Sequence, residues 1–162
     1  MAEGVTATMA ETPVGAVEHH DAGTGPAVMF VHGSPGGFDE GELMSRFLVT
    51  AGFRVVSLSR PGYLATPLTD ANATPDAQAA LHAALLDALG LDSVAVACWS
   101  GGGPSSYRLA AVHPERVSAL VAIAAVSGPY TFAKSVEGSM LEGRFGRWLI
   151  GEMAKHLSLI HI

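Results

Sequence analysis

One serine in this chain stands where a nucleophile could be presented to a substrate. The apolar run at residues 94–99 leads directly to Ser100, and three glycines at 101–103 precede a stretch of helical composition. A chain that turns from strand to helix so quickly strains the residue at its apex and lifts that side chain clear of the sheet. The pattern predicts that Ser100 is a nucleophile and that the Gly101 N–H, at the helix start, faces a developing oxyanion.

The residues two before and two after this serine must be small, because the strand and helix backbones crowd there. Gly102 meets the requirement fully, and Cys98 meets it roughly. Cys98 is a second candidate nucleophile, but the turn puts residue 100 at its apex, so Cys98 is expected to be a packed small residue. Trp99 is expected either to line a substrate pocket or to pack beneath the turn. A phosphate-binding loop is disfavoured, since no Lys-Ser/Thr follows the glycines and no G-x-G-x-x-G frame fits.

A second glycine-rich loop, HGSPGG at residues 32–37, follows a short apolar run. A loop of this kind after a central strand can aim a backbone N–H at the same oxyanion, and the Ser34 N–H is the expected donor. His32 is expected to be structural and to hold the loop through its ring nitrogens. His19 and His20 are expected to face solvent, because a metal site would need more ligands nearby.

The elements that would position these loops alternate along the chain. Strands are predicted at residues 5–9, 14–20, 27–31, 53–58, 93–97 and 117–126. Helices are predicted from an Asp39 cap, with Glu42 as its capping-box partner, to about residue 51, from Thr74 to Gly90, and over 104–112. Short apolar strands alternating with helices predict a mainly parallel α/β sheet with helices on both faces.

The composition of the chain limits the classes of partner that it can be expected to bind. The chain has 162 residues, of which 49% are hydrophobic, and a net charge of −6, which argues against a nucleic-acid partner. No apolar run is long enough to span a membrane, and the first residues lack a secretory signal, so a cytoplasmic location and no membrane partner are expected. A single cysteine excludes an internal disulfide. No metal site and no cofactor are predicted.

Four stretches resemble the α/β-hydrolase superfamily, in its alpha/beta hydrolase-1 group of serine esterases, lipases and peptidases. They are VMFVHGSPGG, RVVSLSRPGY, LGLDSVAVACWSGGGP and LAAVHPERVSALVAIAAV, in the family's order between about residues 14 and 130. The resemblance implies a nucleophile at Ser100 and an oxyanion hole made by the Ser34 and Gly101 amides. The supporting motif residues are His32, Gly33, Trp99 and Gly102.

Two positions depart from the family pattern without removing the nucleophile. Ser59 stands where the family usually has Asp before Arg-Pro-Gly, and Cys98 replaces the glycine of the elbow. Haloalkane dehalogenases and epoxide hydrolases of the superfamily carry Asp at the elbow. Ser100 therefore predicts acyl transfer: hydrolysis of a small-molecule ester, thioester or amide through an acyl-enzyme.

The acid and the histidine of the family's triad follow the serine in chain order, and neither is expected within these residues. No glutamate after Ser100 follows a strand, and the later histidines are not expected to reach the serine. The histidines are His113, His156 and His161, and the glutamates are Glu115, Glu137, Glu142 and Glu152.

The chain is therefore expected to be an N-terminal fragment that is nearly inactive by itself. Residues 1–130 would form part of the hydrolase core, and 131–156 would begin a lid or form a surface helix over the last strand. The final LSLIHI, residues 157–162, resembles a translated sequencing-library transposon end and is expected to be non-native. An apolar strand at 117–126 left as a sheet edge predicts poor solubility or oligomerisation, whereas the native oligomeric state is not predicted.

Two alternatives share the same elbow. One is a non-catalytic hydrolase-fold protein that binds a small ligand or a partner; loss of the elbow serine or of the oxyanion loop would mark it, and both are intact. The other is a different chemistry at the same serine, such as haloperoxidase-like activity or C–C bond hydrolysis. The sequence does not separate these chemistries from ester hydrolysis.

Overall fold

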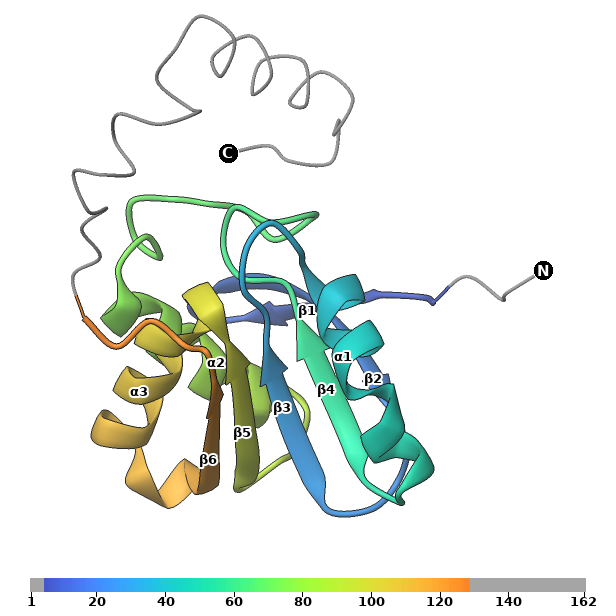
Figure 1. Ribbon diagram of the computed structural model, residues 1–162. Helices are drawn as coiled ribbons and strands as arrows, with labels where there is room; N and C mark the ends of the chain where they lie inside the picture. The colour runs from blue at the N-terminus through green and yellow to red at the C-terminus, as the bar shows by residue number, and fades with distance from the viewer. Residues whose placement is uncertain (1–4, 129–162) are drawn as a thin grey trace, which may run out of the picture.

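The structure is a computed structural model that describes residues 5–128. Over these residues the chain forms one six-stranded sheet in the order β1-β2-β4-β3-β5-β6 (Figure 1). The predicted lid-like segment 131–156 and the predicted tail 157–162 lie outside the described residues.

Within this sheet β2 runs opposite to the other five strands. The pairs β1–β2 and β2–β4 are antiparallel, and β4, β3, β5 and β6 run parallel to one another. The predicted mainly parallel α/β sheet is confirmed. The strands are β1 (Thr8–Thr12), β2 (Gly15–Ala22), β3 (Ala27–Val31), β4 (Arg54–Leu58), β5 (Val94–Trp99) and β6 (Val117–Ile123).

Helices cover both faces of the sheet, as predicted (Figure 1). Alternate residues of β3 show the two faces, because side chains of a strand point to opposite sides. Val28 and Phe30 belong to the core cluster that packs against α1, while Met29 and Val31 belong to the larger cluster under α2 and α3. The helices are α1 (Phe38–Thr50), α2 (Pro75–Ala88) and α3 (Gly103–Val112), with 3-10 turns at Ser100–Gly102 and Pro114–Arg116.

The helix starts show one correct and one wrong prediction. The Thr74 hydroxyl caps α2 by accepting the Ala77 N–H at 3.2 Å, as expected for a threonine before a first-turn proline. The predicted Asp39 cap is wrong, because the N-cap of α1 is Gly37, two residues earlier. Asp39 lies in the first turn, and its carboxylate accepts the N–H groups of Gly37 and Glu40 at 3.0 and 2.9 Å.

The outer strands differ from their predicted bounds. The β1–β2 hairpin turns at Pro13-Val14, so β1 lies three residues later in the chain than predicted. The last strand ends at Ile123 rather than at residue 126, because Ala124 takes a φ of 44° and turns the chain away from the sheet. Within residues 5–128, β6 is an edge strand with Val121 55% exposed.

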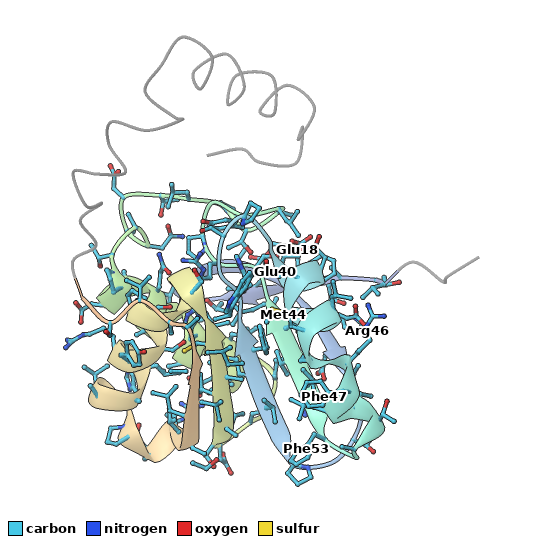
Figure 2. The ribbon with its side chains drawn as sticks, viewed as in Figure 1. Glu18, Glu40, Met44, Arg46, Phe47 and Phe53 are labelled. Atoms are coloured by element: carbon cyan, nitrogen blue, oxygen red, sulfur yellow. The ribbon has the colours of Figure 1, made fainter. Side chains whose placement is uncertain are left out.

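An apolar hollow of about 240 Å³ lies on the α1 face of the sheet. Phe47 and Phe53 lie on this side of the molecule, near the end of α1 and the start of β4 (Figure 2). The floor of the hollow is formed by β3, β5 and β6, and includes Val121 and Ile123 of the edge strand.

No helix in residues 5–128 combines the length and apolar character needed to cross a membrane.

Candidate active site

Ser100 lies at the apex of the turn from β5 into α3, with a φ of 47°. A non-glycine residue in this left-handed region costs about 1–2 kcal/mol relative to an ordinary conformation. The conformation is held from outside the turn: the Ser100 carbonyl accepts the Val126 N–H at 2.9 Å, just after β6. The strained backbone that the sequence predicts for a nucleophile elbow is therefore present.

The elbow packs closely against the chain that leaves β3. A Cβ on Gly102 would lie only 2.3 Å from the Val31 carbonyl oxygen, and one on Gly33 would lie 2.9 Å from the Ser100 Cβ. The need for glycine at 102 thus comes from the exit of β3 as well as from the turn itself. This contact brings the 32–37 loop to the base of the candidate nucleophile.

Cys98 is buried in the larger core cluster, opposite Ala122 of β6 and Val31 of β3. Burial raises the pKa of its thiol, which keeps the sulfur protonated and poorly nucleophilic. Trp99 packs against the α1-side cluster, and its ring edge lies 3.0 Å from the position of a Cβ on Gly33. Trp99 therefore packs beneath the turn, beside the loop.

The amides predicted to bind an oxyanion lie in neighbouring segments. A Cβ on Gly101 would lie 3.6 Å from the Ser34 hydroxyl, so Ser34 and Gly101 come together next to Ser100. Each of the two peptide units has its carbonyl hydrogen-bonded: the Ser100 carbonyl accepts from Val126, and the Gly33 carbonyl accepts from His32 and Arg60. Both peptide planes are therefore fixed from behind.

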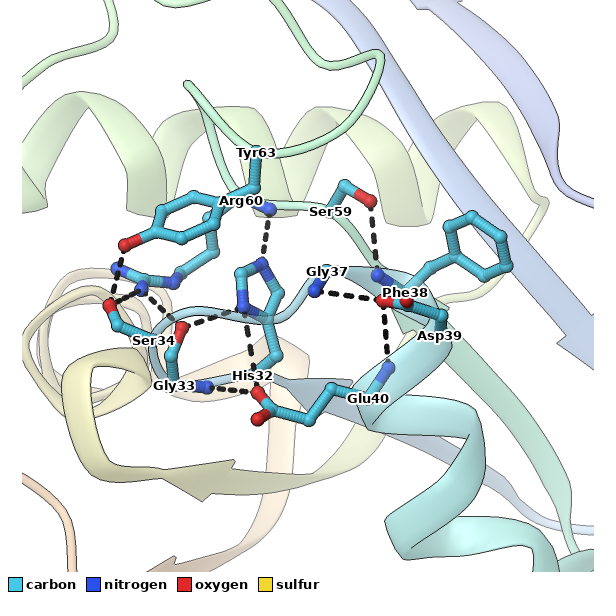
Figure 3. Close-up of polar contacts among 10 residues, drawn as sticks. All are labelled: His32, Gly33, Ser34, Gly37, Phe38, Asp39, Glu40, Ser59, Arg60 and Tyr63. Carbon is cyan, nitrogen blue, oxygen red and sulfur yellow. Dashed lines mark hydrogen bonds and ion pairs between the residues drawn. The ribbon is translucent and has the colours of Figure 1, made fainter. Parts of the chain in front are cut away.

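His32 holds the loop through both ring nitrogens. Its Nε2 accepts the Arg60 backbone N–H at 2.8 Å, so the ring proton is on Nδ1, which donates to the Gly33 carbonyl at 2.7 Å (Figure 3). Burial, with the nearby Arg60 charge, lowers the pKa of His32 to about 3. A neutral ring with both nitrogens occupied is a structural group, and it has no proton-accepting site free for Ser100.

Sequence reasoning assigned no role to Arg60 and Tyr63, although both lie in the quoted RPGY motif. The Tyr63 hydroxyl is 2.5 Å from the Ser34 hydroxyl, and the Arg60 guanidinium lies over the Tyr63 ring at 4.7 Å (Figure 3). His32 meets the same ring edge-on, with centroids 4.8 Å apart. The motif was visible, but only the fold brings it against the loop at 32–37.

Ser59, where the family usually has Asp, joins three segments. Its hydroxyl donates to the Glu18 carboxylate at 2.9 Å and accepts the Phe38 N–H at the start of α1 at 3.0 Å. The carboxylate missing at residue 59 is thus supplied by Glu18 of β2. Glu40 secures the other side of the loop, where its carboxylate accepts the Gly33 N–H at 3.2 Å.

No histidine among residues 5–128 is hydrogen-bonded to the Ser100 hydroxyl. His82 is buried between α2 and α3, where its Nε2 lies 3.1 Å from the Ser105 hydroxyl. His113 follows α3 and pairs with Glu115 at 3.8 Å. His19 is buried, so the expectation that it faces solvent is wrong; β2 lies inside the sheet, and the face that carries His19 also carries the core residue Val17. Residues 5–128 hold no cluster of three His, Cys, Asp or Glu side chains suited to a metal ion.

Ser100→Gly should stabilise the protein relative to Ser100→Ala. Both variants lose the hydroxyl, but glycine adopts a φ of 47° without the steric cost that alanine retains. The whole protein here means the complete gene product that contains these residues. We expect its glycine variant to have a free energy of unfolding about 1 kcal/mol higher than the alanine variant, and so to unfold at a higher denaturant concentration. Equal midpoints would show that the elbow is not strained in solution.

Two buried histidines should make folding weaken in acid. Burial lowers the pKa of both His32 and His82 to about 3 from 6.5, so below pH 6.5 the unfolded chain binds protons that the folded chain does not. Stability then falls as pH drops from about 6.5 toward 3, by about 1.4 kcal/mol per pH unit per histidine. Denaturant unfolding of His82→Leu between pH 6 and pH 4 should show a slope smaller by about that amount. Ser105→Ala, which keeps the imidazole, should retain the full slope, and a slope unchanged in His82→Leu would contradict the prediction.

The chain belongs to the alpha/beta hydrolase fold family, whose model matches residues 26–153. Its fold also matches an alpha/beta hydrolase fold protein from Nakamurella multipartita with a TM-score of 0.75 and 52% identity, covering 93% of this chain and 53% of that one. The expected family and fold are thereby confirmed.

Curated relatives are named as hydrolases of different kinds. A 2-hydroxy-6-oxononadienedioate/2-hydroxy-6-oxononatrienedioate hydrolase from Dechloromonas aromatica is 30% identical over 88% of this chain and 52% of its own length. Epoxide hydrolase 2 from Siraitia grosvenorii is 33% identical over 61% of this chain and 32% of its own length. The chain spans about half the length of the first curated relatives it matches. These relatives are named as hydrolases, and their names differ in the bond that is cleaved.

Proposed function

We propose that the whole protein is a serine hydrolase that cleaves small esters, thioesters or amides through an acyl-enzyme on Ser100. The observation that carries the proposal is the placement of Ser100 at a left-handed apex, with Gly33 packed against its Cβ. Gly101 and Ser34 meet beside it and offer two backbone N–H groups to a developing oxyanion. A cytoplasmic location remains a prediction.

In the proposed reaction the Ser100 oxygen attacks the carbonyl carbon while a general base takes its proton. The carbonyl π electrons move to the oxygen, where the Gly101 and Ser34 N–H groups stabilise the negative charge. Collapse of the intermediate expels the alcohol, thiol or amine, which takes up the proton from the base. Water then attacks the acyl-enzyme in the same manner, releasing the acid and restoring the serine.

The general base and its acid are proposed to come from residues outside 5–128. Within the described part of the chain, His32 and His82 are buried and neutral, and neither contacts Ser100. The family's order of serine, acid and histidine along the chain agrees with a later position for both groups.

The chemistry of a serine favours acyl transfer over epoxide opening. An aspartate that opens an epoxide forms an ester, which water can hydrolyse. A serine would form an ether instead, and an ether gives water no activated carbonyl to attack. Ser100 therefore supports an acyl substrate despite the similarity to an epoxide hydrolase.

Hydrolysis of a C–C bond is a second candidate. The similarity to relatives named 2-hydroxy-6-oxononadienedioate/2-hydroxy-6-oxononatrienedioate hydrolases, which extends over 88% of the chain, favours it. The two candidates are separated by assaying the whole protein on p-nitrophenyl esters and on a 2-hydroxy-6-oxo dienedioate, and comparing kcat/KM.

Covalent trapping tests the proposed nucleophile. A fluorophosphonate incubated with the whole protein should add one phosphonyl group, and peptide mass spectrometry should place it on Ser100. Ser100→Ala should take up none. Labelling of Cys98, or of no residue in a folded and active sample, would overturn the proposal.

A further inference from the structure

A buried arginine lies directly behind the proposed oxyanion site. Arg60 follows β4 and is 8% exposed. Its Nη2 donates to the Gly33 carbonyl at 2.7 Å and to the Ser34 hydroxyl at 3.4 Å (Figure 3). The same nitrogen lies 3.2 Å from the position of a Cβ on Gly101. The guanidinium therefore lies next to both residues whose amides would bind an oxyanion.

The positive charge of Arg60 has no contacting counter-ion in the described part of the chain. Residues 5–128 contain no carboxylate within ion-pair distance of it, and its Nε has no hydrogen-bond partner there. Burial lowers the pKa of the guanidinium, while Tyr63 and the charge of Glu40 act in the opposite direction. A buried charge without a contacting carboxylate is costly to keep. Since the loop needs no charge to satisfy one carbonyl, the placement favours a role in stabilising negative charge nearby.

The guanidinium of Arg60 acts on the peptide unit between Gly33 and Ser34. The Gly33 carbonyl accepts from the Arg60 Nη2 and from the His32 Nδ1, each at 2.7 Å. That carbonyl and the Ser34 N–H belong to the same planar peptide, so fixing one fixes the direction of the other. A charged donor on the carbonyl also polarises the peptide and makes its N–H a stronger donor.

Arg60 and His32 are also hydrogen-bonded to each other, so Arg60, His32 and Gly33 form a closed set of hydrogen bonds. The Arg60 backbone N–H donates to the His32 Nε2 at 2.8 Å, and this bond is what commits the ring proton to Nδ1 and hence to Gly33. The other candidate donor, Gly101, has only a neutral backbone group behind it, because the Ser100 carbonyl accepts the Val126 N–H. The guanidinium lies near both candidate donors, but of the two peptide units it is hydrogen-bonded only to the one that carries the Ser34 N–H.

We propose that Arg60 is a positioning residue of the oxyanion hole, which, with His32, clamps the Gly33–Ser34 peptide and strengthens the Ser34 N–H as a donor to the transition state. The inference rests on the proposed function. It assigns Arg60 no contact with the substrate. Its effect should appear in the chemical step, where charge develops on the substrate oxygen, and hardly in substrate binding.

The test replaces the guanidinium in the whole protein and follows hydrolysis of a p-nitrophenyl ester. Arg60→Met should lower kcat about 10- to 100-fold, less than the roughly 10²- to 10³-fold loss when a donor itself is removed, and should change KM less than about threefold. Arg54→Met is the matched control, because Arg54 lies at the opposite end of β4, where it pairs with Asp21 at 2.6 Å. Its kcat should stay within about twofold.

A purely structural role would make activity follow thermal stability, so unfolding temperatures are measured for every variant. Arg60→Lys keeps the charge and Arg60→Gln keeps a neutral donor, so the lysine variant should exceed the glutamine variant about fivefold in kcat even where their unfolding temperatures agree. This pair carries the test if Arg60→Met does not fold. Equal rates for the pair, or an unchanged kcat in folded Arg60→Met, would overturn the clamp.

The Ser100→Ala variant separates the two levels of inference. If it is inactive while Arg60→Met keeps full activity, the clamp is wrong and the proposed function stands. If Ser100→Ala itself retains ester hydrolysis, the proposed function fails and the role of Arg60 fails with it.

Discussion

Replacing Ser100 with alanine should lower kcat/KM of the whole protein for ester hydrolysis by about 10⁴-fold or more. The substitution removes only the hydroxyl group, and without it no acyl-enzyme can form. The remaining reaction is attack of water on a carbonyl that the Ser34 and Gly101 amides still bind. Stopped-flow measurement with a p-nitrophenyl ester should also lose any initial burst of nitrophenol. The size of the effect follows from losing covalent catalysis as a whole, rather than one hydrogen bond.

The loss should occur in a folded protein. Alanine keeps the backbone conformation of Ser100 with its cost, so the unfolding temperature should change by only a degree or two. Cys98→Ser is the matched control: it alters the other candidate nucleophile, which is buried, and should keep most of the activity. If Cys98→Ser abolished hydrolysis while Ser100→Ala retained it, the assignment would be reversed.

Gly102→Ala should destabilise the protein by about 3 kcal/mol or more, at the upper end of single-site effects. A Cβ there would lie 2.3 Å from the Val31 carbonyl oxygen and 2.7 Å from the His32 carbonyl oxygen. Both are backbone atoms at the exit of a central strand, so neither can move without displacing β3. Urea unfolding should show the loss, accompanied by a fall in activity because Ser100 and the loop shift apart.

The control for this substitution is a glycine with free space around it. A Cβ on Gly128 would meet no atom of residues 5–128 within 4 Å, so Gly128→Ala should leave stability within about 0.5 kcal/mol. A comparable urea midpoint for Gly102→Ala and Gly128→Ala would show that the close approach of β3 and the elbow is absent in solution.

Most of the fold could be predicted from the sequence because its signals are local. Apolar runs mark the parallel strands, and Thr74-Pro75 marks the start of α2 through groups that act within one turn. The errors fall where distant segments decide the outcome. The strand at β6 ends early because Ala124 turns toward the elbow, and His19 is buried because β2 pairs on both sides.

The candidate site was predictable to a similar extent. The serine, the glycines and the 32–37 loop can be recognised from the local sequence, and the resemblance to the family implies their roles. The roles of Arg60 and Tyr63 cannot be recognised in this way. Both residues lie more than 20 positions away from the loop, so their distance from it in space depends on strand order. Ser59 shows the same limit: its departure from the family pattern is offset by Glu18, a residue 41 positions earlier in the chain.

The close crossing of β3 and the elbow bears on how the protein could be re-engineered. A Cβ on Gly33 or on Gly102 would lie less than 3 Å from an atom of the neighbouring segment, so we expect side chains at these two positions to destabilise the protein. Leu64 is 42% exposed and lies beside Gly37 of the 32–37 loop, so its side chain can change in size without displacing packed backbone. A directed-evolution campaign would therefore keep the two glycines and vary exposed positions beside them.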